Sequence, residues 1–144
     1  MKALATIIIG FIAGLAISGV LGDLIDLGRF CAGRIQAAWL TSMAANDLAG
    51  AKYSAAAKKY SKALTKISPK NKNLTAKTKS NLALSILLQA QQDNDKEAAQ
   101  SALLIFHEAL ELFKEIPDEQ KAQETQTNIQ EAEKIIEALE VQRA

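Results

Sequence analysis

An uncharged segment long enough to span a bilayer begins near the N-terminus. Residues Ala3 to Gly22 read ALATIIIGFIAGLAISGVLG, and none of these twenty residues is charged. At ~1.5 Å of rise per residue, a helix of this length extends about 30 Å, the thickness of the hydrocarbon core of a bilayer. A backbone in lipid must satisfy its own hydrogen bonds, so a spanning segment is helical. The sequence therefore predicts a single-pass transmembrane anchor helix over residues 1–22.

A cleaved secretory signal is the alternative interpretation of the same segment. Met1 and Lys2 form a short positive start, and the small residues around Ala16 and Ser18 fit a cleavage site. The apolar run continues to Leu21, however, and this full spanning length favours a retained anchor. The lysine-rich stretch further along the chain favours a cytoplasmic position for the C-terminal part.

Small residues recur at intervals of four within the uncharged segment. They are Gly10, Gly14, Ser18 and Gly22. On a helix this spacing places them along one groove, where a second helix can approach closely and gain dispersion contacts. We therefore expect a helix–helix contact in the membrane, with a second copy of the chain or with another subunit.

Charge divides the rest of the chain into a basic middle and an acidic end, although the net charge is only +1. Residues 48–92 contain nine lysines and no acidic residue, whereas residues 93–144 contain thirteen acidic residues and five basic ones. The basic middle either attracts an anionic partner or is neutralised by the acidic end of the same chain. A possible basic interaction face on one helix consists of Lys52, Lys59, Lys62 and Lys66.

Hydrophobic periodicity predicts an all-α fold. All seven glycines lie at or before Gly50 and there are only two prolines, which argues against a β-rich chain with its frequent turns. Apolar residues at helical spacing predict helices over residues 23–48, 51–67, 75–91 and 119–142, and another between Asp95 and Pro117. Asp95 is expected to cap that helix, and each proline is expected to end a helix.

Two of the predicted helices share a motif. Ala56, Tyr60 and Ala63, followed by Leu64, recur 46 residues later as Ala102, Phe106 and Ala109, followed by Leu110. This pattern resembles the second helix of a tetratricopeptide repeat (TPR), in which alanine allows close helix approach and the aromatic ring fills the space between neighbours. The segment Asp47 to Tyr53 also resembles the tight turn of that family. The spacing of 46 residues departs from the 34-residue period of the family.

The resemblance implies a stack of antiparallel α-hairpins over residues 37–144. The repeat-like units cover about residues 37–70 and 75–117, residues 118–142 form a capping helix, and residues 23–36 form a helical connection to the anchor. In the family, the first helix of each pair lines a groove that takes a peptide or a partner helix. In this chain those helices are about Ile35–Leu48 and Thr75–Gln91.

The sequence offers little for catalysis or metal binding. It contains one cysteine and one histidine, and no glycine-rich phosphate loop. His107 and Glu111 are one turn apart, but no third metal ligand accompanies them. The lysine face lacks arginine and interleaved aromatic residues, which argues against nucleic-acid binding. We expect no enzyme activity, cofactor, metal, nucleic acid or small-molecule substrate, and we expect Cys31 to be a packed apolar residue.

These observations predict a membrane-anchored protein–protein interaction module. It would act as an accessory subunit, adaptor or assembly factor of a larger membrane complex. Its partners would be the lipid bilayer and other protein subunits. One alternative is a membrane receptor that captures targeting peptides or partner proteins in a TPR-like groove. Another is a purely structural subunit.

Overall fold

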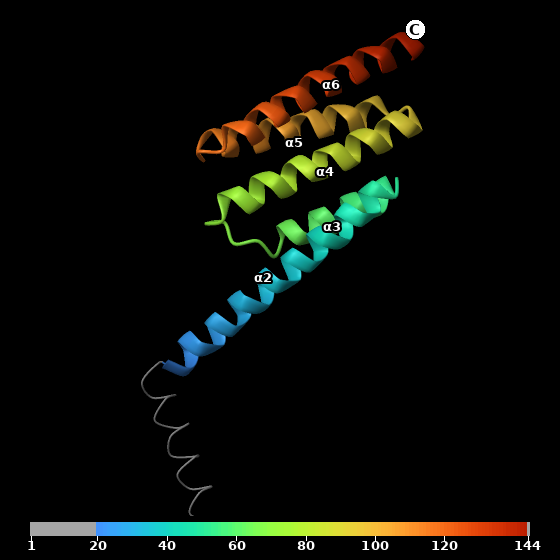
Figure 1. Cartoon of the computed structure of the whole chain (residues 1–144). Helices are drawn as coiled ribbons and strands as arrows, with labels where there is room; N and C mark the ends of the chain where they lie inside the picture. The colour runs from blue at the N-terminus through green and yellow to red at the C-terminus, as the bar shows by residue number, and fades with distance from the viewer. Residues whose placement is uncertain (1–19, 144) are drawn as a thin grey trace, which may run out of the picture. The chain divides into compact units, whose positions relative to one another are not determined.

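The described part of the chain is entirely helical. The computed structural model describes the backbone of residues 20–143 and the side chains of residues 31–141. This part contains five helices and no strand, which confirms the all-α fold class (Figure 1). The helices are α2 (Val20–Ala49), α3 (Tyr53–Leu64), α4 (Lys72–Asp93), α5 (Lys96–Lys114) and α6 (Glu119–Arg143).

The predicted transmembrane segment lies almost wholly outside the described residues. Among the helices that the structure describes, from Val20 onward, none has both the length and the apolar character needed to cross a bilayer. The chain divides into two units, Met1–Ile35 and Gln36–Ala144, and the second contains the three apolar clusters of the core.

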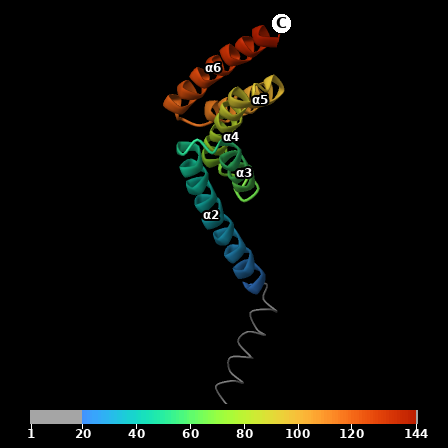
Figure 2. The ribbon, with the colours of Figure 1, turned by 90° about the vertical axis from the view of Figure 1, so that its right-hand side faces the viewer.

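Within Gln36–Ala144, helix α4 is the central element. It packs against α3, α5 and α6, and α5 packs against α6 as well (Figures 1 and 2). The helices approach closely because alanines occupy the contact positions. Ten alanines of the described part of this unit have no exposed surface: Ala37, Ala44, Ala56, Ala63, Ala76, Ala83, Ala99, Ala102, Ala109 and Ala132.

The core consists of aromatic and aliphatic side chains between these helices. Phe106 of α5 lies with Leu87 of α4 and Ile129 of α6 in the largest cluster. Tyr60 of α3 joins Ala44 of α2 in a second cluster. Three buried hydroxyls, those of Thr78, Ser85 and Thr125, each donate to the carbonyl one turn earlier in their own helix. These bonds explain how polar side chains are accommodated in the core.

Side-chain caps set the starts of three helices. The amide of Ala98 donates to Oδ1 of Asp95 over 3.0 Å, so the predicted cap of α5 is confirmed. Asn71 accepts from the amide of Leu74 over 3.1 Å and starts α4 three residues before the predicted position. Asp118 performs the same role at the start of α6. Each cap satisfies an amide that has no partner within its helix.

The prediction of a helix over residues 51–67 is wrong at both ends, because α3 covers only Tyr53–Leu64. At the start, Ala51 adopts a φ of 56°, which no helical residue can have. At the end, Thr65 is the C-cap residue, and the amides of Lys66 and Ile67 both donate to the carbonyl of Ala63 in a tight turn. The helix has therefore ended before Pro69 is reached.

The prediction of a packed Cys31 is also wrong, because its side chain is exposed on α2. The apolar residues at helical spacing around it gave the correct helix. They did not indicate which face of that helix is covered, because a neighbouring element decides burial.

We expect Ala51→Gly to stabilise the protein. The left-handed conformation costs a residue with a Cβ about 1–2 kcal/mol, whereas ordering a glycine costs about 0.5–1 kcal/mol more backbone entropy on folding. The net gain in the free energy of unfolding is therefore roughly 0.5–1 kcal/mol, measured by urea denaturation. Ala55→Gly, within α3, is the control and should lose about 0.5–1 kcal/mol. A loss of stability for Ala51→Gly would contradict the turn geometry.

Candidate interaction surface

A cavity lies between α4 and α6. Its volume is about 330 Å³. We call it the α4–α6 groove, and its lining residues are Lys77, Ser80, Asn81, Leu84, Phe113, Lys121, Glu124, Thr125 and Asn128. The lining residues of α4 are separated by three, one and three positions along the sequence, and those of α6 have the same separations. This spacing places each set on a single face of its helix. Phe113 is contributed by α5.

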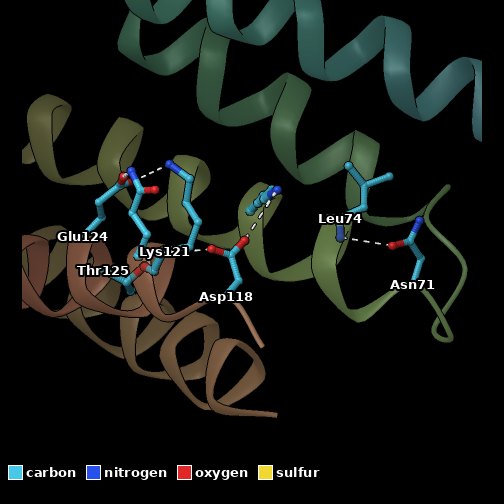
Figure 3. A network of polar contacts seen from close by, with 8 residues as sticks. Asn71, Leu74, Asp118, Lys121, Glu124 and Thr125 are labelled. Atoms are coloured by element: carbon cyan, nitrogen blue, oxygen red, sulfur yellow. Dashed lines mark hydrogen bonds and ion pairs between the residues drawn. The ribbon is translucent and has the colours of Figure 1, made fainter. Parts of the chain in front are cut away.

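The charges around the groove largely offset one another. Lys121 forms an ion pair with Glu124, and its backbone amide donates to Asp118 over 3.2 Å (Figure 3). The Nζ of Lys77 lies 3.8 Å from Oδ2 of Asp118. The hydrogen bond from Lys121 lowers the pKa of Glu124, so this carboxylate is ionised at neutral pH. The groove therefore offers hydrogen-bonding groups without a large net charge.

Amide and hydroxyl side chains complete the groove. Asn81 hydrogen-bonds to the hydroxyl of Tyr60, and burial raises the pKa of this tyrosine, an effect that the hydrogen bond opposes. Asn128 has no side-chain hydrogen bond within residues 31–141. Asparagine side chains both donate and accept, so they match the amide groups of a peptide backbone.

The predicted basic face is only partly available. Lys59 forms an ion pair with Asp47 of α2, so one of the four lysines of that face already has an acidic partner within the chain. Lys52, Lys62 and Lys66 are exposed, and no acidic side chain of residues 31–141 forms an ion pair with any of them.

Lys62 and Lys66 also line a second cavity of about 290 Å³. Gln36, Trp39 and Leu40 of α2 complete its lining, and we call this site the Trp39 pocket. The indole of Trp39 is 62% exposed, which is unusual for the largest apolar side chain of a small domain. The structure thus adds an aromatic ring to part of the predicted basic face.

The acidic end of the chain neutralises part of the basic middle. Three lysines of α4 pair with acidic residues further along the chain: Lys72 with Glu115 (2.5 Å), Lys77 with Asp118, and Lys79 with Glu108. Exposed pairs of this kind contribute little stability, about 0–1 kcal/mol each. Within residues 31–141, Lys52, Lys62 and Lys66 of the predicted basic face are left without an acidic partner.

The six predicted repeat-packing residues all lie in the core. Ala56, Ala63, Ala102, Phe106 and Ala109 have no exposed surface, and Tyr60 is 1% exposed. Of the predicted membrane helix-packing residues, Gly10, Gly14 and Ser18 lie outside the described residues. Gly22 lies within α2.

No metal-binding cluster occurs in the part of the chain that the structure describes. His107 and Glu111 are both exposed on α5. Their neighbour Glu108 forms an ion pair with Lys79 of α4. Glu111 in turn forms an ion pair with Lys114 on the same helix, so His107 and Glu111 lie on a solvated helix face without a third ligand beside them among the described residues.

No protein-family model, curated protein or solved structure matches this chain.

Two features of this surface were not apparent from the sequence. The spacing of Lys77 and Asn81 could have indicated a polar face on α4, but its neighbour α6 lies about forty residues further along the chain. The exposure of Trp39 gave no sequence signal, because tryptophan at helical spacing usually faces a core.

Proposed function

We propose that the chain is a membrane-anchored protein–protein interaction module that serves as an accessory subunit, adaptor or assembly factor of a larger membrane complex. The observation that carries this proposal is the α4–α6 groove, whose polar lining comes from two neighbouring helices. The uncharged segment Ala3–Gly22 supports the membrane anchor by its length and composition. The small residues of that segment offer a second contact, with a neighbouring spanning helix.

The helical domain is a TPR-like scaffold in this proposal. Support comes from the two alanine–aromatic–alanine series, which occupy buried positions on α3 and α5. Helix α6 acts as the cap, because it presents acidic and amide side chains on its exposed face. A terminal helix with a polar outer face is what a stacked helical array needs in order to stay soluble.

A membrane receptor for peptides is the second candidate function. The groove favours it, because Ser80, Asn81 and Asn128 offer both donors and acceptors to an extended backbone. A receptor would bind its peptide reversibly, whereas a subunit or assembly factor would remain with its complex through purification.

The test is a purification of the full chain in a gentle detergent, with identification of the chains that co-purify. We expect a stoichiometric partner, and we expect Asn81→Ala combined with Asn128→Ala to reduce its recovery by roughly tenfold or more, because each lost hydrogen bond costs about 1 kcal/mol. Gln123→Ala combined with Gln130→Ala, on exposed positions of α6, is the matched control and should retain the partner.

The outcomes separate the candidates. Stoichiometric recovery that depends on the two asparagines supports the subunit or adaptor. Recovery only of substoichiometric peptides, displaced by washing, favours the receptor. An unchanged partner in the double asparagine variant would show that the groove is not the binding site.

A further inference from the structure

We propose that the Trp39 pocket is a contact site for an anionic membrane surface. The inference rests on the proposed function, since the anchor places the chain at a bilayer. It adds a specific orientation: Trp39, Lys62 and Lys66 face lipid headgroups, whereas the α4–α6 groove is left for protein partners.

The pocket combines one aromatic ring with two cations. Trp39 and Leu40 come from α2, and Lys62 and Lys66 come from α3, where they are one helical turn apart. Both lysines are exposed, and 62% of the Trp39 side chain is accessible to solvent. Tryptophan is suited to the interface between headgroups and hydrocarbon, because its ring is apolar and its N–H can hydrogen-bond.

Charge complementarity argues for an anionic occupant. The one acidic side chain that contacts the basic face of α3 within the described residues is Asp47, and Lys59 already pairs with it. The lysines of α4, by contrast, have acidic partners from the end of the chain. The positive charge of Lys62 and Lys66 is therefore left for a partner outside residues 31–141.

A lipid surface fits this site better than a protein partner does. The apolar part of the lining is limited to Trp39 and Leu40, which is small for the apolar centre of a stable protein interface. Lysine carries a flexible, strongly hydrated charge that needs no fixed geometry, and each lysine near an anionic leaflet contributes about 1 kcal/mol. Trp39 follows Gly22 by seventeen residues of α2, so the proposed anchor keeps the site within about 25 Å of the bilayer.

Trp39 is the single tryptophan of the chain, so its fluorescence reports this site alone. The full chain is reconstituted into nanodiscs of phosphatidylcholine, with or without about 30% phosphatidylserine as the anionic lipid, and with acyl chains brominated or not. We expect bromolipids to reduce Trp39 emission by about twofold in anionic nanodiscs and to have little effect in neutral ones. The effect should weaken as salt is raised, because the attraction is screened.

Charge-reversal variants provide the matched comparison. Lys62→Glu combined with Lys66→Glu should abolish the quenching in anionic nanodiscs. Lys114→Glu combined with Lys134→Glu makes the same change in net charge on exposed positions of α5 and α6, and it should leave the quenching unchanged. Equal loss in both double variants would overturn the site, because net charge alone would then explain the effect.

The remaining outcomes separate this inference from the anchor. The chain could enter nanodiscs while aqueous acrylamide still quenches Trp39 in both lipids. This result would overturn the lipid contact of Trp39 and would still agree with the proposed anchor. Protection of Trp39 only when a co-purified protein is added would overturn it in favour of protein docking. If the chain does not enter nanodiscs, the proposed anchor fails. A blue shift on adding anionic vesicles would then still support the pocket, and no shift would overturn it.

Discussion

Replacing Phe106 with alanine is expected to lower the free energy of unfolding by about 3–5 kcal/mol. Phe106 has no exposed surface and lies in the cluster that joins α4, α5 and α6. Its removal eliminates the ring and leaves a space that the surrounding alanines are too small to fill. Urea or guanidinium denaturation followed by circular dichroism measures the loss as a lower midpoint.

Leu104→Ala is the matched control on the same helix. The Leu104 side chain is 66% exposed, so its truncation should change the free energy of unfolding by no more than about 0.5 kcal/mol. Similar effects for the two substitutions would mean that α5 does not present the Phe106 face to its neighbours. The packing of the second repeat-like unit would then be wrong.

The second large effect concerns the uncharged segment. Ile12 lies near its centre, and an aspartate there is expected to cost about 3–4 kcal/mol of insertion free energy. This corresponds to a shift of at least about a hundredfold in the ratio of inserted to uninserted chain. We therefore expect Ile12→Asp to move most of the protein out of the membrane fraction, as measured by fractionation and immunoblotting.

Ile35→Asp is the control for added charge. Ile35 lies outside the uncharged segment, and its side chain is 70% exposed on α2, so an aspartate is readily solvated there. This variant should remain in the membrane fraction. Normal retention of Ile12→Asp would indicate that residues 3–22 do not sit in hydrocarbon.

Much of the fold follows from local signals in the sequence. Period-3.6 spacing located every helix from residue 20 onward, and the carboxylate of Asp95 identified the start of α5. The ends of α3 were missed for a physical reason. Ala51 lies in a backbone region that alanine avoids, and backbone hydrogen bonds to Ala63 form the turn at Thr65, so neither residue type signals a helix end.

Burial on α4 shows where single-helix patterns stop being informative. The one-sided helical spacing of this segment predicts Leu82, Ala83, Ile86, Leu87 and Ala90 as core residues. Four of them are buried, and Ile86 is partly buried against the core. Ala76, Thr78 and Ser85 are buried too, because α3, α5 and α6 surround this helix. A periodicity argument assumes one covered face, so it cannot find the central helix of a stack.

The candidate surfaces depended still more on tertiary structure. The lysines of α3 were recognisable as a basic face from the sequence. Only the fold shows that Asp47 forms an ion pair with Lys59 and that Trp39 lines a pocket with Lys62 and Lys66. The α4–α6 groove depends on how α4 and α6 are aligned along each other, and the sequence of either helix alone does not determine this alignment.

Fractionation of the native, full-length chain tests the central claim most directly. Membranes are washed with alkaline carbonate, then extracted with a gentle detergent, and the recovered protein is checked for its N-terminal residues. We expect the intact chain to stay with the membranes through the wash, to enter solution only with detergent, and still to carry residues 1–22. An intact chain recovered in the aqueous fraction before any detergent is added would contradict it.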